Sequence, residues 1–228
     1  FIKGNQIQLR YKTMSEQVNY QVIRSFGPSV FKVKIPDSIL NHLNSYVEEI
    51  IQNKKKQAEL NWAHKLAGDV TEEFILEKEI IEKSGWLKFL YICVQKWIGI
   101  ETQKKITKFN VERSWIVRQF QNEYNPTHWH NGHISGAGFL KLPKSFGDHK
   151  QKGKDSDYSG GKLQLIHGTK MFLCDSTLTI KPEVGDFYFF PNYLMHTVYP
   201  FKNTNEERRS ISFNATIDNN IYDVYGGN

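Results

Sequence analysis

Histidines are concentrated in one short segment of the sequence, and another stands apart further along the chain. His128, His130 and His133 lie within residues 127–133, whereas His196 follows much later. Because residues i and i+2 of a β-strand project to the same face, His128 and His130 could offer both imidazoles to one metal ion. His196 could supply a third ligand, and His133 could contact a ligand or the substrate. The spacing predicts a metal site of the mononuclear non-haem iron type, whose usual set is two histidines and one carboxylate.

A histidine pair of this kind, taken alone, is more often hydrogen-bonded than metallated, so the polar residues of a later segment matter. In the strand predicted for residues 208–217, Arg208, Ser210 and Ser212 share one face and Arg209 lies on the other. A guanidinium and a hydroxyl two residues apart can bind a carboxylate, the guanidinium through two parallel hydrogen bonds. The alternatives are an edge strand with two surface arginines, and Arg209 in place of Arg208.

The elements that must position these residues change character near residue 110. Apolar residues at spacings of three and four predict helices in the N-terminal half. One follows a cap at Asp37 or Ser38 and reaches Ile51, one begins near Asp69 with a capping box to Glu72 and ends at Ser84, and one runs from Trp86 to Gly99.

The second half has the short segments, turn residues and β-branched or aromatic residues of β-structure. We expect strands at Trp115–Phe120, Ser135–Leu142, Lys162–His167, Thr177–Ile180, Asp186–Phe190, Thr197–Tyr199 and Arg208–Ile217. Seven short strands with few helices between them indicate antiparallel sheets in a sandwich or jelly roll. Residues 143–161 form one long loop, of the kind that is usually a functional lid or disordered. The predicted fold class is α+β, with helices packed outside a barrel-like core.

These motifs also occur in a characteristic order. The histidine pair is followed by residues 134–140, Gly160-Gly161, residues 182–191, the lone His196 and the Arg-x-Ser of Arg208. In this order the sequence resembles the iron(II)/2-oxoglutarate-dependent dioxygenases over residues 111–217. Within that superfamily it most resembles a small subgroup from marine bacteria and their phages, which it also matches at Leu66-Ala-Gly68 and Glu72-Glu-Phe74.

The resemblance implies a fold, an activity and a set of site residues. The fold would be a double-stranded β-helix, and the activity would be hydroxylation of a substrate, with dioxygen and 2-oxoglutarate consumed and succinate and CO2 released. Fe(II) would be held by His128, His130 and His196, and the far carboxylate of 2-oxoglutarate by Arg208 with Ser210. His130 stands where most of the superfamily has Asp or Glu, which would make the site more positive by one charge. Tyr124, Asn125, Trp129 and Asn131 are candidates for lining the site.

Length and composition limit the remaining classes. The chain has 228 residues, of which 39% are hydrophobic, enough for a core, and no apolar run approaches the roughly 20 residues of a membrane helix. We expect residues 1–13 to be an extension before Met14, and 14–228 to be a single oxygenase domain, with 14–110 a mainly helical support and 111–228 the jelly-roll core. Cys93 and Cys174 lie far apart in apolar surroundings, which predicts reduced core thiols and a cytoplasmic location.

The charge of the chain bears on its partners. The net charge is +6 with a pI of about 9.1, which could attract nucleic acid, although a solvated lysine surface is the favoured interpretation. Two alternatives to a hydroxylase stay open: a cupin-like barrel that binds a metal or carboxylate without turnover, and a nucleic-acid-directed oxidative demethylase. The primary substrate and the oligomeric state are not predicted.

Overall fold

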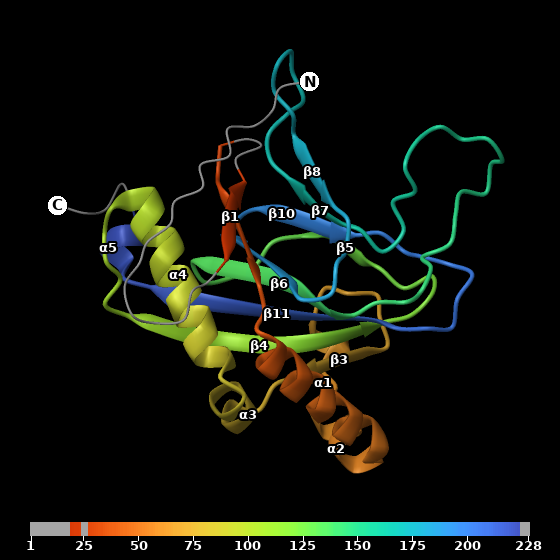
Figure 1. The fold of residues 1–228 in the computed structure, drawn as a ribbon, viewed down its shortest axis with the longest axis horizontal. Helices are drawn as coiled ribbons and strands as arrows, with labels where there is room; N and C mark the ends of the chain where they lie inside the picture. Colours follow the sequence, from red (N-terminus) through yellow and green to blue (C-terminus); the bar gives the residue numbers. More distant parts are fainter. Residues whose placement is uncertain (1–18, 24–26, 224–228) are drawn as a thin grey trace.

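The described part of the protein consists of two antiparallel β-sheets and a group of helices (Figure 1). The computed structural model describes residues 19–23 and 27–223. The extension expected at residues 1–13 lies outside the described residues. Within them, the predicted α+β architecture of N-terminal helices and antiparallel sheets is confirmed.

The larger sheet has seven strands, and every neighbouring pair is antiparallel. In spatial order they are β1 (Tyr20–Ile23), β2 (Val30–Lys34), β9 (Asp186–Pro191), β6 (Ile134–Lys141), β11 (Arg208–Ile217), β4 (Phe109–Gln119) and β3 (Glu72–Ile75). β11 lies between β6 and β4, near the centre of the sheet, so both of its edges are hydrogen-bonded to neighbouring strands. Its alternate residues point to the two faces of the sheet.

The smaller sheet has four strands and faces one side of the larger one. Its order is β5 (Asn125–His128), β10 (Met195–Val198), β7 (Leu163–Ile166) and β8 (Thr177–Ile180). Apolar side chains from both sheets form a common buried cluster, which includes Phe139, Phe190, Leu163, Leu165 and Val198. Burial of this apolar surface holds the two sheets together, because its removal from water is the main favourable term in packing.

The helices cover the other face of the larger sheet, as Figure 1 shows for α1 and α4. They are α1 (Asp37–Gln52), α2 (Lys54–Leu60), α3 (Lys78–Lys83) and α4 (Trp86–Thr102), with a 3-10 turn at Ala63–Lys65 and a short C-terminal helix α5 (Asn219–Tyr222). Leu43 and Trp86 belong to one buried cluster with Phe187 and Phe213 of the sheet. The Trp86 indole donates a hydrogen bond of 3.0 Å to Ser114 Oγ on β4. The order of layers is therefore helices, larger sheet, smaller sheet.

The prediction of a helix from Asp69 to Ser84 is wrong for the residues before Lys78. Residues Glu72–Ile75 form strand β3, which pairs with β4 so that Glu73 lies opposite Val117. Asp69 does not cap a helix, because its backbone forms a bridge with Tyr124. Only Lys78–Lys83 are helical. A short apolar run is compatible with either structure, and here the pairing with β4 decides it.

Other differences concern the extent of the elements. The region expected to be mainly helical also contains strands β1 and β2, and β4 begins at Phe109, before the expected Trp115. His196 stands between the expected strands Asp186–Phe190 and Thr197–Tyr199, but in the structure it lies within β10. Residues 143–161 contain no helix or strand, as predicted, and this connection extends outward on the right of Figure 1.

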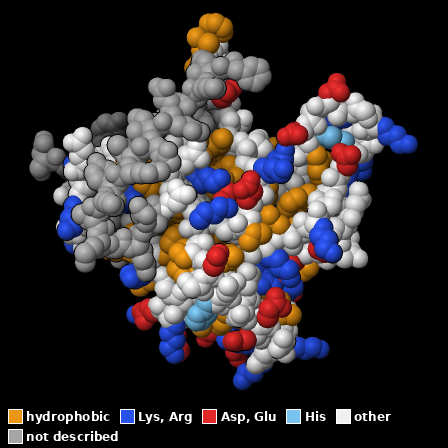
Figure 2. Space-filling model, in the orientation of Figure 1, with side chains coloured by type: hydrophobic (Ala, Val, Ile, Leu, Met, Phe, Trp, Pro, Cys, Tyr) orange, Lys and Arg blue, Asp and Glu red, His pale blue; other side chains and the backbone are white. Residues whose placement is uncertain are grey.

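Cys174 corrects the expectation of two core thiols. Both cysteines are free and Cys93 is buried, but Cys174 is exposed in the turn between β7 and β8. The neighbouring Met171, Phe172 and Leu173 are also exposed, Phe172 by 92%. They account for the hydrophobic tip at the top of Figure 2, where Figure 1 shows this connection. Apolar sequence surroundings do not by themselves bury a thiol.

Charged groups are mixed over the visible surface. Figure 2 shows Lys and Arg side chains interspersed with Asp and Glu across this face.

Among the described helices, none is long and apolar enough to cross a membrane.

Candidate active site

Two of the predicted metal ligands are brought together by the smaller sheet. His128 on β5 and His196 on β10 are directly paired residues of the two strands, and their ring centroids are 4.3 Å apart. Each ring is held by the carbonyl two residues earlier: His128 Nδ1 lies 2.6 Å from the Pro126 oxygen and His196 Nδ1 lies 2.9 Å from the Leu194 oxygen. Because a carbonyl only accepts, Nδ1 carries the proton in both rings and Nε2 keeps its lone pair.

His130 reaches the same place by a different route. Strand β5 ends at His128, so His130 does not continue it. Its backbone is instead fixed by Asn192: the His130 N–H donates to the Asn192 carbonyl at 3.0 Å, and the Asn192 side-chain amide donates to the His130 carbonyl at 3.1 Å. Its ring lies edge-on to Trp115 of β4, at a centroid distance of 5.4 Å. His130 thus links the smaller sheet to the larger one.

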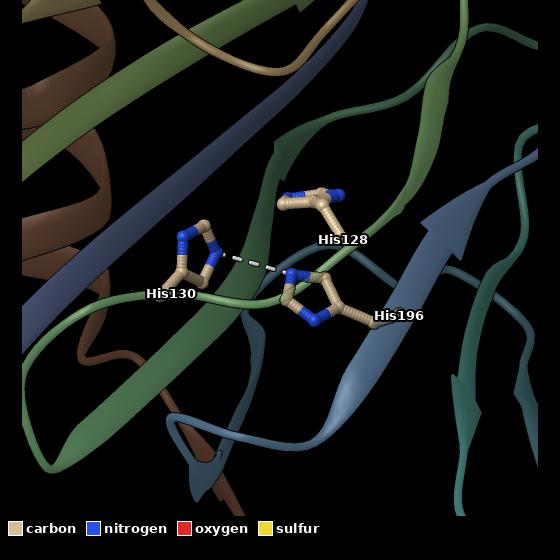
Figure 3. A group of neighbouring side chains, drawn as sticks. All are labelled: His128, His130 and His196. Carbon is tan, nitrogen blue, oxygen red and sulfur yellow. Dashed lines mark hydrogen bonds between the residues drawn. The ribbon is translucent and has the colours of Figure 1, made fainter.

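The three imidazoles converge on one point, as Figure 3 shows. Their potential ligand atoms all lie within 4.8 Å of one another, and His130 Nε2 is 3.1 Å from His196 Nε2. Two nitrogens bound at a right angle to one ion, each at about 2.1 Å, are about 3 Å apart. The observed separation therefore fits two adjacent ligand positions of a single metal ion.

All three rings have pKa values below the usual range. Burial, together with the nearby His196 and His128 rings, lowers the pKa of His130 to about 2. Burial and then His128 lower that of His196 to about 3, and burial lowers the pKa of His128. Since a metal binds only the neutral imidazole, the ligand form is already present at neutral pH.

A pocket of about 280 Å³ lies between the sheets and includes all three histidines in its wall. Arg208 and Ser210 of β11 also line it. The Arg208 guanidinium donates to Ser210 Oγ at 3.1 Å and to Gln119 Oε1 at 3.3 Å, and its Nε donates to the Gly161 carbonyl at 3.0 Å. Gly161 has a φ of 70°, a conformation open to glycine, which lets the chain turn and present this carbonyl.

Arg208 is buried without a carboxylate partner among the described residues. It is 2% exposed, its hydrogen-bond acceptors are all neutral, and its guanidinium carbon lies 5.0 Å from the centre of the Phe139 ring. Burial lowers its pKa to about 9, so the group is still a cation at neutral pH. A buried cation without a counter-ion favours binding of an anion in the adjoining space.

Arg209 has the opposite environment. It points to the helix side of the sheet, where it forms ion pairs with Glu207 at 2.5 Å and with Glu48 at 2.7 Å, and donates to Asn44 Oδ1 at 3.0 Å. It does not line the pocket. Its charge is compensated within the protein, and its place in the fold is structural.

The remaining candidates divide into pocket residues and structural residues. Asn125, Trp129 and Asn131 line the pocket, whereas Tyr124 does not. His133 does not line it either: its Nδ1 accepts from the Ile217 N–H at 3.0 Å, and its ring stacks on Tyr222.

Sequence reasoning missed some residues of the site. Glu73 lines the pocket, and Gln119 and Gly161 hold Arg208. Glu73 belongs to the Glu72-Glu-Phe74 motif and Gly161 to the Gly160-Gly161 motif, but the sequence pattern puts Glu73 in a helix and gives neither residue a role in the site.

Comparison with known proteins gives one family match and several similar folds. Residues 113–214 match the family described as "Putative 2OG-Fe(II) oxygenase", where 2OG is 2-oxoglutarate. A prolyl-4-hydroxylase from Pseudomonas putida has a similar fold, with a TM-score of 0.51, 14% identity, and 82% of this chain and 91% of that chain covered. The viral collagen prolyl hydroxylase of Paramecium bursaria Chlorella virus-1 aligns with a TM-score of 0.48, 16% identity and coverage of 82% and 94%. No curated protein sequence gives a significant match.

The fold of two sheets with N-terminal helices is thus the double-stranded β-helix of these oxygenases. Over residues 113–214 the chain thus resembles the 2OG-Fe(II) oxygenase superfamily, whose members are oxidoreductases. That superfamily uses Fe(II), 2-oxoglutarate and dioxygen.

Proposed function

We propose that this protein is an Fe(II)- and 2-oxoglutarate-dependent dioxygenase that hydroxylates its substrate, with release of succinate and CO2. One observation carries the proposal: a buried guanidinium, which has no carboxylate partner among the described residues, lines the same pocket as three neutral imidazoles with converging nitrogens. A metal site next to an anion site is what a metal-chelating dicarboxylate cosubstrate requires.

In this proposal His128, His130 and His196 hold Fe(II). Their short Nε2 separation and lowered pKa values support it, because both favour binding of a cation by neutral rings. His130 replaces the usual carboxylate, which leaves the site with no compensating charge from its three ligands. When bound, iron would activate dioxygen, which is the oxidant, and 2-oxoglutarate would supply two electrons through its oxidative decarboxylation, so that one oxygen atom can be inserted into a substrate C–H bond.

Arg208 and Ser210 hold the far carboxylate of 2-oxoglutarate. Gln119 and Gly161 fix the guanidinium before the cosubstrate arrives, so little ordering is needed on binding. Apolar Leu163 and Val198 line the same pocket and help to exclude water.

The finer assignments rest on the sequence. Leu66-Ala-Gly68 and Glu72-Glu-Phe74 support membership of the subgroup from marine bacteria and their phages. The free Cys93 and Cys174 support work in the reducing cytoplasm. The buried cluster shared by the helices and the larger sheet supports a single oxygenase domain over residues 14–228.

The test is an anaerobic titration of the purified protein with Fe(II) and 2-oxoglutarate, followed by the visible metal-to-ligand charge-transfer band. We expect the band in the wild type and in His42→Ala, whose histidine is exposed on α1, and no band in His196→Ala. A folded wild type that binds the metal but gives no band and no succinate would instead favour the cupin-like binding barrel.

A further inference from the structure

A second polar feature of the pocket is not used by the proposed iron and cosubstrate sites. Glu73 on β3 lines the pocket and is 2% exposed. It is paired with Val117 on β4, which is in turn paired with Ser210 on β11. Directly paired residues of neighbouring strands share a face. The Glu73 carboxyl therefore lies on the pocket face of the sheet, two strands from the proposed carboxylate clamp.

Two oxygen atoms in this part of the pocket have no hydrogen-bond partner. They are Glu73 Oε2 and Asn125 Oδ1, both buried among the described residues. Both side chains close on Gly68: a β-carbon there would lie 2.9 Å from Glu73 Oε1 and 2.3 Å from Asn125 Oδ1. Gly68 thus permits two acceptor groups to approach the same small region. Buried polar groups nearly always have a hydrogen-bond partner. Two buried acceptors without one, in the same pocket, therefore indicate a ligand that donates hydrogen bonds.

Nothing in the described protein neutralises Glu73. Its neighbours in the wall, Trp115 and Val117, belong to a buried apolar cluster. Three cations line the same pocket, and none of them forms an ion pair with Glu73. Lys65 and Arg113 lie against the Trp62 ring, at 4.3 Å and 5.2 Å from its centre. Arg208 donates instead to Gly161, Gln119 and Ser210. Burial and, to a smaller extent, the charge of Glu123 raise the pKa of Glu73 from 4.5 to about 7.

The adjacent Glu72 shows that this isolation is particular to Glu73. Glu72 points away from the pocket, forms an ion pair with Arg118 and accepts a hydrogen bond from Gln57 at 2.9 Å. The backbone of Glu73 is well fixed, because its carbonyl accepts from the Trp62 N–H at 2.7 Å and its N–H donates to Asn61 Oδ1 at 3.2 Å. The carboxyl is held in place without a partner of its own.

We infer that Glu73 and Asn125 form the binding site for a protonated amine of the primary substrate, so that the oxygenase acts on an amine. This inference rests on the proposed function and names its substrate class. An ammonium group provides several N–H donors for the two acceptors and a positive charge for the carboxylate. An alcohol of the same size could satisfy one acceptor but would leave the carboxylate uncompensated.

The test compares n-hexylamine with 1-hexanol as probes of equal length. Binding to the full-length protein is measured by calorimetry, both with Fe(II) and 2-oxoglutarate under anaerobic conditions and without metal. We expect saturable binding of hexylamine at neutral pH, weaker by at least tenfold in Glu73→Gln, and weaker binding of hexanol. The control Glu72→Gln changes the neighbouring carboxylate on the other face and should bind hexylamine as the wild type does.

The different failures can be separated. Glu73→Gln should keep the charge-transfer band with Fe(II) and 2-oxoglutarate, so a lost band would indicate damage to the iron site. Hexylamine bound directly to iron would bind Glu73→Gln and the wild type equally, and that result would overturn the inference. So would equal affinity for hexanol, or no saturable binding of hexylamine to the wild type. If the wild type gives no band, the proposed activity fails, while amine binding to the metal-free protein still tests the site.

Discussion

His128 and His196 are cross-strand partners, so the register between β5 and β10 itself brings these two imidazoles together. Both rings also use the same local device, a bond from Nδ1 to the carbonyl two residues earlier. The Nε2 atoms proposed as metal ligands are therefore oriented by hydrogen bonds within the protein. A slip of one residue between these strands would send one ring to the opposite face.

The first prediction concerns removal of one of these partners. His196→Ala should weaken divalent metal binding by more than the 10–100-fold that loss of an outer hydrogen-bond partner usually costs, because a ligand itself is lost. Calorimetric titration with Fe(II) under anaerobic conditions measures this. The exposed His42→Ala should leave the affinity unchanged. Equal metal affinity in His196→Ala and the wild type would rule out His196 as a ligand.

The second prediction concerns the unusual third histidine. His130→Asp introduces the carboxylate found in the usual ligand set and lowers the charge of the site by one unit. We expect His130→Asp to bind Fe(II), because Asn192 and not the ring fixes the backbone at this position. His130→Ala offers no ligand atom and should not bind Fe(II). The same titration distinguishes the two variants. Wild-type affinity in His130→Ala would show that the ring is dispensable.

The third prediction separates the two neighbouring arginines. Arg208→Ala should weaken 2-oxoglutarate binding by about 2–5 kcal/mol, because the cosubstrate carboxylate loses its charged partner. Arg209→Ala should instead lower the free energy of unfolding, because it leaves Glu207 without one of its buried partners. Titration with 2-oxoglutarate and urea unfolding, applied to both variants, give the two quantities. If Arg209→Ala weakened 2-oxoglutarate binding and Arg208→Ala lowered the free energy of unfolding, Arg209 would face the pocket, and the register of β11 would be wrong by one residue.

The contrast between these arginines also shows what the sequence could predict. Strict alternation along residues 208–213 was enough to predict that Arg208 and Ser210 share a face, and the structure has them on the pocket side. A strand with a clear two-residue period carries its own orientation. The convergence of His128 with His196 could be expected only through the order of motifs, because no local pattern encodes which strands pair.

Glu73 and His130 show why the rest could not be predicted. The run that contains Glu73 is compatible with a helix or a strand, and its pairing with β4 involves residues more than forty positions away. For His130, the rule that residues i and i+2 of a strand share a face predicts a ring beside that of His128, and the structure brings the two rings together. The reason differs, because the strand ends at His128 and Asn192 fixes the backbone of His130. In both cases long-range contacts decide the local structure.

The last prediction concerns the effect of Glu73 on stability. Its pKa is about 7 in the folded protein and near 4.5 when the chain is unfolded. Between these values the folded state binds more protons than the unfolded state, so stability decreases as pH rises from 4.5 to 7. The raised pKa corresponds to about 3 kcal/mol lost over this range.

Urea unfolding of the metal-free protein between pH 5 and pH 8 measures this effect. His130 and His196, with lowered pKa values, destabilise the folded state as pH falls below about 6.5, which opposes the Glu73 contribution. The difference between the wild type and Glu73→Gln isolates Glu73, because both proteins keep the histidines. We expect Glu73→Gln to gain stability relative to the wild type as pH rises. Parallel pH profiles would mean that the Glu73 carboxyl is ionised in the folded protein without a raised pKa.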